Sequence, residues 1–225
     1  MAATGQLTVA AIIVAAGDGQ RLGAGRPKAF CEVAGRTLLE HAAARFVSHP
    51  DIRDVVVVAP ASLVESATAL IPAAAVVAGG RTRHASVARG LTALADDVDA
   101  VLVHDVARPF VPAEVISRVI ATMAGGADAV IPVLLVTDTV KRVDQSGAVI
   151  ETLERAALRS VQTPQGFRRS VLVAAHAGAD GSAVTDDAAL VEARGVRVVV
   201  VDGADELFKI TRPWDLALAE LVARR

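Results

Sequence analysis

The chain alternates short, continuous apolar runs with longer amphipathic segments. Each run is three to six residues long and rich in β-branched residues, which predicts a strand that is buried on both faces. The predicted strands cover residues 9–14, 55–59, 76–78, 100–104, 129–133 and 196–201. Strands that alternate with helix-length segments predict an α/β fold with a single doubly wound, mostly parallel sheet.

The segments between the runs carry helix-start signals. Thr37 with Glu40, and Ser62 with Glu65, each fit a capping box that opens a helix. Further helices are expected over residues 82–94, 112–123, 170–177, 186–193 and 213–223.

Residues 136–152 do not follow this alternation of strands and helices. They fit two short strands around a turn at Gln145, Ser146 and Gly147. A hairpin inserted in an α/β domain is expected to be a lid over the site or an arm for a partner subunit, with an edge decoration of no further role as the alternative.

Composition narrows the class of protein. With 225 residues, 53% of them hydrophobic, the chain suits one large domain or at most two small ones, and we expect a flexible tail over residues 1–8 and one domain over 9–225. No apolar run is long enough to span a membrane, and no secretory signal is recognisable at the start. The single cysteine, Cys31, favours a cytoplasmic location, and the net charge of −2 argues against a nucleic-acid partner.

The stretch VAAGDGQRLGAGRPKAF, residues 14–30, follows the first predicted strand and is typical of a phosphate-binding loop. Its small residues let backbone N–H groups approach an anion, and these are Ala15, Ala16, Gly17 and Gly19. Gly17, Gly19 and Gly23 are spaced one residue too widely for a dinucleotide fingerprint, and no Walker lysine follows. Arg21 and Lys28 add two fixed charges, which favours phosphoryl or nucleotidyl transfer over a merely solvated basic loop.

Two further clusters follow predicted strands, so they are expected at the same edge of the sheet. Asp105 can accept a hydrogen bond from a ribose hydroxyl or take part in a Mg²⁺ shell, and Arg108 can bind a second anion, although the two can also form a simple surface ion pair. The segment from Gly79 to Ser86 leads into a helix, where free N–H groups favour an anion or a base carbonyl.

Four further polar residues each indicate a functional site only weakly when taken alone. They are Arg155, Thr163, Thr185 and Lys209. Thr185, for example, can simply cap a helix that starts at Asp186. The five histidines show no metal spacing, and His104 is expected in the core or behind the site. The sequence contains no G-x-S-x-G nucleophile elbow, so a covalent intermediate is not indicated.

Taken in order, these segments resemble the 2-C-methyl-D-erythritol 4-phosphate cytidylyltransferases of non-mevalonate isoprenoid synthesis. The resemblance runs from about residue 9 to residue 221 and is carried by AAGDGQRLGAGRPKAF, AGGRTRHASV, VLVHDVARPF, VTDTVKR, QTPQGF, VTDDAALVE and FKITRPWDLALAE. It implies a Rossmann-like nucleotidyltransferase fold. It also implies in-line attack of the acceptor's phosphate oxygen on the α-phosphorus of CTP, which gives 4-diphosphocytidyl-2-C-methyl-D-erythritol and pyrophosphate.

The resemblance also implies roles for individual residues. Four would be catalytic: Arg21 and Lys28, which would stabilise the pentacoordinate phosphorus, and Arg155 and Lys209, which would position the methylerythritol phosphate. The residues that would hold CTP are Ala15, Ala16, Gly17, Gly19, Gly80, Ser86 and Asp105. Asp105 would meet the ribose and the environment of a Mg²⁺ ion, or of another divalent cation, held mainly by the CTP phosphates.

Thr163 and Thr185 would lie near the acceptor. Arg108 and Thr139 would reach the acceptor of a neighbouring subunit, because in this family the hairpin arm interlocks a homodimer. Three positions depart from the family pattern: Val14 replaces a proline, Val106 an alanine, and Arg81 an acidic residue.

Several alternatives stay open on the sequence alone. A ribitol-5-phosphate cytidylyltransferase would share the CTP contacts and differ only in the acceptor pocket. The HDxARP and TPQ segments argue against a guanylyl- or uridylyltransferase, and the glycine spacing argues against an NAD-dependent oxidoreductase. A non-catalytic nucleotide-binding module would be expected to lack Arg21 or Lys28. Whether Asp205 or Glu206 faces the site is also open.

Overall fold

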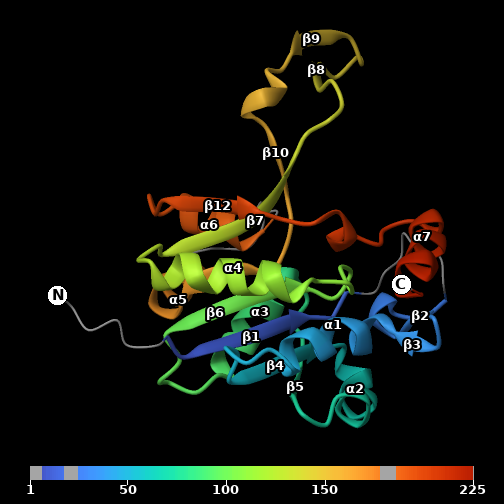
Figure 1. Cartoon of the computed structure of the whole chain (residues 1–225), viewed down its shortest axis with the longest axis vertical. Helices are drawn as coiled ribbons and strands as arrows, with labels where there is room; N and C mark the ends of the chain where they lie inside the picture. Colours follow the sequence, from blue (N-terminus) through green and yellow to red (C-terminus); the bar gives the residue numbers. More distant parts are fainter. Residues whose placement is uncertain (1–6, 18–24, 178–185, 225) are drawn as a thin grey trace.

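A central sheet of eight strands organises the molecule, as shown by a computed structural model that describes residues 7–17, 25–177 and 186–224 (Figure 1). The strand order is β10-β7-β11-β6-β1-β4-β5, and β12 also pairs with β7. The strands are β1 Val9–Val14, β4 Asp54–Ala59, β5 Ala75–Ala78, β6 Ala100–Asp105, β7 Ala129–Leu135, β10 Arg159–Val161, β11 Gln165–Arg168 and β12 Val198–Asp202.

Most of these strands run in one direction. β1 pairs in parallel with β4 and β6, β4 with β5, and β12 with β7. β11 lies antiparallel between β6 and β7, and β10 is antiparallel to β7. All six predicted strands are present and the predicted α/β class is confirmed, whereas β10 and β11 were not predicted.

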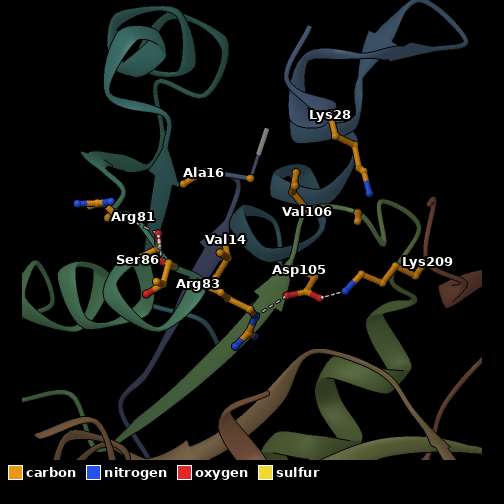
Figure 2. A pocket seen from close by; sticks show the side chains of 13 residues that line it. Val14, Ala16, Lys28, Arg81, Arg83, Ser86, Asp105, Val106 and Lys209 are labelled. Atoms are coloured by element: carbon orange, nitrogen blue, oxygen red, sulfur yellow. Dashed lines mark hydrogen bonds and ion pairs between the residues drawn. The ribbon is translucent and has the colours of Figure 1, made fainter. Parts of the chain in front are cut away.

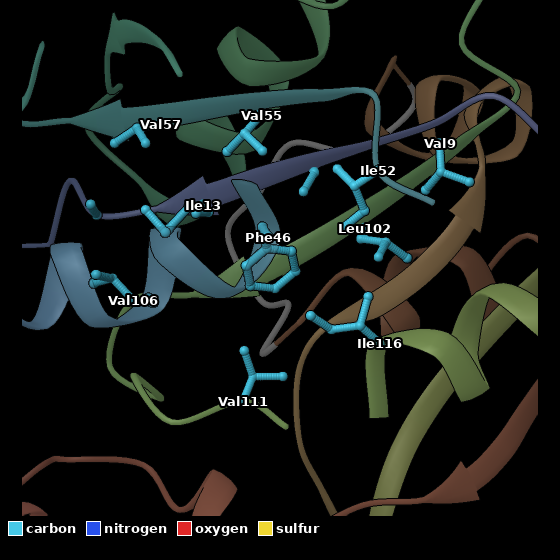
Figure 3. Close-up of a cluster of buried hydrophobic side chains, with 14 of the residues drawn as sticks. Val9, Ile13, Phe46, Ile52, Val55, Val57, Leu102, Val106, Val111 and Ile116 are labelled. Carbon is cyan, nitrogen blue, oxygen red and sulfur yellow. The ribbon is translucent and has the colours of Figure 1, made fainter. Parts of the chain in front are cut away.

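Helices cover both faces of the sheet, as the doubly wound prediction requires. The α-helices are α1 Leu38–Val47, α2 Val64–Leu70, α3 Arg83–Thr92, α4 Ala113–Ala124, α5 Arg169–Ala177, α6 Asp187–Glu192 and α7 Pro213–Ala223. Because successive side chains of a strand point to opposite faces, Ile13 of β1 belongs to a core cluster with residues of α1, α2 and α4. Ile12 belongs to the cluster on the other face, with residues of α3, α5 and α6. Figure 3 shows the first of these clusters, with Phe46 of α1 and Ile116 of α4 near Leu102 of β6.

Short elements complete the chain. Two small strands, β2 Glu32–Val33 and β3 Arg36–Thr37, pair with each other, and α7 packs on β2. Four 3₁₀ turns are described, and they are η2 Lys28–Phe30, η3 Ala61–Leu63, η4 Arg155–Ala157 and η5 Asp205–Leu207.

One predicted capping box is confirmed and the other is wrong. Thr37 Oγ1 accepts from Glu40 N at 3.1 Å, and the Glu40 carboxylate accepts from Thr37 N at 2.7 Å, so both halves of the box at α1 are present. Ser62 caps no helix, because Pro60 opens the 3₁₀ turn η3, in which Leu63 N donates to Pro60 O at 2.9 Å. The following helix α2 therefore begins only at Val64.

Helix α6 begins one residue later than predicted. The Asp186 side chain accepts from Ala189 N at 3.0 Å, so Asp186 is the N-cap and the helix begins at Asp187. The alternative in which Thr185 caps this helix concerns a residue that lies outside the described residues.

The predicted hairpin is present and projects away from the sheet (Figure 1). Its antiparallel strands are β8 Lys141–Val143 and β9 Val149–Thr152. In the turn, Asp144 Oδ1 accepts from the backbone N–H groups of Ser146 and Ala148, and Gly147 adopts a positive φ of 85°. Over the part of the chain that the structure describes, no helix is long and apolar enough to cross a membrane.

Candidate active site

A cavity of about 690 Å³ opens at the carboxyl edge of the sheet (Figure 2). It lies there because β1 and β6 are parallel and in register, with Val14 opposite Asp105, so the loops that follow them leave the sheet side by side. The loop after β5 and the segment around Lys209 close the other sides. Seven of the predicted site residues line the cavity: Ala16, Gly17, Lys28, Gly80, Ser86, Asp105 and Lys209.

Asp105 lies between two cations in this cavity. Lys209 Nζ donates to Asp105 Oδ2 at 2.6 Å, and Arg83 Nε donates to Oδ1 at 3.2 Å (Figure 2). Burial alone would raise the pKa of Asp105, but the charges of Arg83 and Lys209 outweigh it and hold this pKa well below its usual value. Asp105 is therefore a carboxylate at any physiological pH.

The backbone of Asp105 is held by a buried chain of hydrogen bonds. Asp105 N donates to Thr163 Oγ1 at 3.1 Å, and this hydroxyl lies 3.1 Å from His104 Nδ1. His104 Nε2 lies 3.0 Å from Arg108 O, which can only accept, so Nε2 carries the proton and Nδ1 accepts from Thr163. Burial lowers the pKa of His104 to about 4, which keeps the ring neutral. The expectation that His104 lies in the core or behind the site is confirmed.

The loop after β5 is built for close packing. A Cβ at Gly79 would overlap Ala16, so glycine there allows this loop to approach the loop after β1. A Cβ at Gly80 would overlap Ala85, so glycine there allows the loop to pack against the start of α3. Ser86 Oγ accepts from Gly80 N at 3.1 Å and donates to Thr82 O at 2.9 Å. Ser86 thereby fixes the backbone of this loop where it borders the cavity.

The segment from Leu207 to Ile210 forms hydrogen bonds with residues of the loops that follow β1 and β6. Lys28 Nζ donates to Ile210 O at 2.7 Å, and Ile210 N donates to Ala107 O at 2.8 Å. Arg108 donates to Leu207 O at 2.6 Å and to Val161 O at 3.0 Å. Lys28, Lys209 and Asp105 therefore converge although they come from three distant parts of the sequence.

Other predicted site residues lie apart from the cavity. Arg155 and Thr139 are exposed at the base of the arm, where Arg155 Nη1 donates to Thr137 O at 2.6 Å. Ala15 is buried behind the cavity, with its N–H bonded to Val58 O at 2.8 Å. Thr163 and Arg108 also lie outside the lining. Gly19, Arg21 and Thr185 fall outside the described residues.

A second cavity of about 650 Å³ lies at the base of the arm and includes Asp205. Neither Asp205 nor Glu206 lines the first cavity, whereas the three departures Val14, Arg81 and Val106 all do. Sequence reasoning assigned no role to Arg83 and Asp187, although both lie in recognised motifs. They were missed because their contact, at 2.6 Å, joins residues 104 positions apart.

Comparisons with known proteins show which family the chain is similar to. The family model for 2-C-methyl-D-erythritol 4-phosphate cytidylyltransferase (IspD) matches residues 9–225. Proteins of that name from Rhodococcus jostii and Frankia casuarinae are 51% and 50% identical over 218 residues, which cover 96% of this chain and 96% and 82% of theirs. The crystal structure of the Thermus thermophilus protein of that name is 42% identical, with a TM-score of 0.80 over 95% of this chain and 98% of that one.

Proposed function

This chain belongs to the 2-C-methyl-D-erythritol 4-phosphate cytidylyltransferase family, and from that premise we propose how its cavity carries out the reaction. The enzyme transfers the cytidylyl group of CTP to 2-C-methyl-D-erythritol 4-phosphate, a step in non-mevalonate isoprenoid synthesis. The products are 4-diphosphocytidyl-2-C-methyl-D-erythritol and pyrophosphate.

The observation that carries the proposal is the charge of the cavity. Among its described lining residues four are basic (Lys28, Arg81, Arg83 and Lys209) and one, Asp105, is acidic. The whole chain has a net charge of −2, so the positively charged lining of this cavity differs in sign from the chain as a whole. A pocket of this kind suits a triphosphate beside a phosphomonoester.

In the proposed mechanism, a phosphate oxygen of the acceptor attacks the α-phosphorus of CTP in line. A new P–O bond forms on one side while the bond to the β-phosphate oxygen breaks on the other, and pyrophosphate leaves with that electron pair. Lys28 and Arg21 stabilise the charge that develops on the phosphorus oxygens. The loops around Ala16, Gly17, Gly80 and Ser86 hold the nucleotide together with Ala15 and Gly19.

In this proposal Asp105 accepts a hydrogen bond from the ribose and borders a metal ion. Mg²⁺ binds through one or two carboxylates together with substrate phosphates and retained water, and one lining carboxylate fits that mode. The described residues hold no group of three or more histidine, cysteine or acidic side chains that could bind a metal by themselves. The donor set therefore suits Mg²⁺, or another divalent cation, held mainly by CTP, where it would neutralise charge on the triphosphate.

The acceptor site, as we propose it, is completed by a second copy of the chain. Lys209 and Arg155 position the acceptor phosphate, with Thr163 and Thr185 nearby, while Thr139 and Arg108 serve the acceptor of the partner subunit. The position of the arm supports this: Arg155 and Thr139 lie at its base, away from the cavity of their own chain, and its strands expose Val143 at 52% and Ile150 at 62%. A two-stranded hairpin with exposed apolar side chains is marginally stable alone, which favours a homodimer through the 136–152 arm.

We further propose that residues 9–225 form one catalytic domain that works in the cytoplasm. The family match over these residues and the single free cysteine, Cys31, support this.

The decisive experiment is an acceptor panel with CTP and Mg²⁺, read as pyrophosphate release. We expect release only when CTP, Mg²⁺ and 2-C-methyl-D-erythritol 4-phosphate are present together. Equal or faster turnover with ribitol 5-phosphate would overturn the acceptor assignment and favour the alternative cytidylyltransferase. CTP binding without turnover on any acceptor would favour a non-catalytic nucleotide-binding module.

A further inference from the structure

Arg83 links the cavity to a buried carboxylate behind it. Arg83 is the first residue of α3, and its guanidinium bridges two acids: Nε contacts Asp105 Oδ1 at 3.2 Å and Nη1 contacts Asp187 Oδ2 at 2.6 Å. Figure 2 shows Arg83 and Lys209 on either side of Asp105. One cation is thus shared between a carboxylate that lines the cavity and one that is fully buried.

Asp187 is itself fixed from behind. It is the first residue of α6 and is 0% exposed, and its second oxygen Oδ1 lies 2.9 Å from Nε2 of the buried His176 in α5. The His176 ring stacks on His84, with ring centroids 4.4 Å apart and planes 15° from parallel. The chain of contacts therefore runs from His176 through Asp187 and Arg83 to Asp105.

The electrostatics keep the two ends of the Arg83–Asp187 contact charged. Burial would raise the pKa of Asp187, but His176 and Arg83 outweigh it and hold this pKa below its usual value. Burial likewise opposes the charge on Arg83, yet its two carboxylates raise the pKa of the guanidinium further. Moving the guanidinium away would leave the buried Asp187 carboxylate without its cation, which is costly, so Arg83 is held in this position.

We infer that Arg83, clamped by Asp187 and His176, is a positioning residue that aims the Asp105 carboxylate at the nucleotide. The inference rests on the proposed function, in which Asp105 meets the ribose and metal environment of CTP. Lys209 bonds one oxygen of Asp105 and Arg83 the other, and the ionised carboxylate keeps further lone pairs for the nucleotide. The planar guanidinium of Arg83 spans two carboxylates as a lysine ammonium would not.

The test is Asp187→Asn, which keeps the shape of the side chain and removes its charge. CTP binding is measured by calorimetry with Mg²⁺ and without acceptor, and steady-state KM values are measured for both substrates. We expect CTP affinity, measured with Mg²⁺, to fall about tenfold or more, the loss typical when a group that orients a metal-binding side chain is removed, with the acceptor KM changed less than twofold. CTP affinity equal to that of wild type would overturn the inference.

Two kinds of variant separate positioning from mere stability. His176→Leu removes the hydrogen bond to Asp187, and His176→Gln retains a donor there, so we expect weak CTP binding in the first and near-wild-type binding in the second. Asp97→Asn is the matched control, because it breaks an exposed arginine–carboxylate pair with Arg53 (2.8 and 2.9 Å), and Asp97 does not line the cavity. Equal CTP affinity in both His176 variants would contradict the inference, and this pair decides the question if Asp187→Asn fails to fold.

Failure of the proposed function is distinguishable from failure of this inference. If wild-type enzyme released no pyrophosphate with any acceptor, the proposed reaction would be wrong, whereas the order of CTP affinities among the variants would still report whether Arg83 is held for the nucleotide.

Discussion

Replacing Thr163 by valine tests the buried hydrogen-bond chain behind Asp105. The Thr163 side chain is buried, and its hydroxyl accepts from Asp105 N and donates to His104 Nδ1, both at 3.1 Å. Valine keeps the size of the side chain and leaves these two buried polar groups unpaired. Since each such group costs about 1–3 kcal/mol, and the added methyl offsets part of this, we expect the free energy of unfolding to fall by about 2–3 kcal/mol.

The assay is urea unfolding of the wild type and of two variants at one protein concentration. Thr163→Ser keeps the hydroxyl and loses a methyl group, so it should cost about 1 kcal/mol or less. The difference in the free energy of unfolding between the two variants therefore reports the contribution of the hydroxyl. If Thr163→Val were as stable as Thr163→Ser and instead raised the acceptor KM, the hydroxyl would face the acceptor. That result would refute the buried chain of hydrogen bonds behind Asp105.

Three further predictions follow from the site, the core and the arm. Lys28→Ala should lower kcat by about 10²–10³ because it removes a charge aimed at the transition state, and a rise in KM alone would assign Lys28 to ground-state binding. Burial lowers the pKa of His104 to about 4, so the unfolded chain binds a proton that the folded chain does not between about pH 6.5 and 4. The free energy of unfolding should therefore fall by up to about 3 kcal/mol as the pH drops through that window, and urea unfolding of His104→Asn should show a flatter profile. Deleting residues 138–150 should yield monomers of low activity by sedimentation, and an intact, fully active dimer would contradict the interlocking arm.

The strands that the sequence predicted are those with continuous apolar runs. β11 escaped prediction because QGFR has one apolar residue among four, although it lies between β6 and β7. Gly166 in this strand faces Val119, Met123 and Leu102, where a Cβ would come within 2.6–3.1 Å of their side chains. Its glycine therefore serves close packing of α4 on the sheet, which no local pattern records.

The position of the site could be predicted, but the direction of its side chains could not. Loops after β1, β5 and β6 had to meet because parallel strands end at one edge of a sheet. A motif places a residue in a loop and leaves open which partner the side chain meets there. Arg108 follows β6 as expected, yet its guanidinium donates to the carbonyls of Leu207 and Val161, which come from segments far along the chain.

Arg83 did carry a local signal that sequence reasoning can use in other proteins. A cation in the first turn of a helix opposes the helix dipole and costs about 0.3–1 kcal/mol at an exposed position. The α3 start reads Arg81, Thr82, Arg83, His84, with no acidic residue in its first turn. A local preference that is violated in this way indicates compensation from elsewhere, and two carboxylates at 3.2 and 2.6 Å supply it. The unfavourable arginine at the helix start was thus the signal for the link between Asp187 and Asp105, while only the fold could identify its partners.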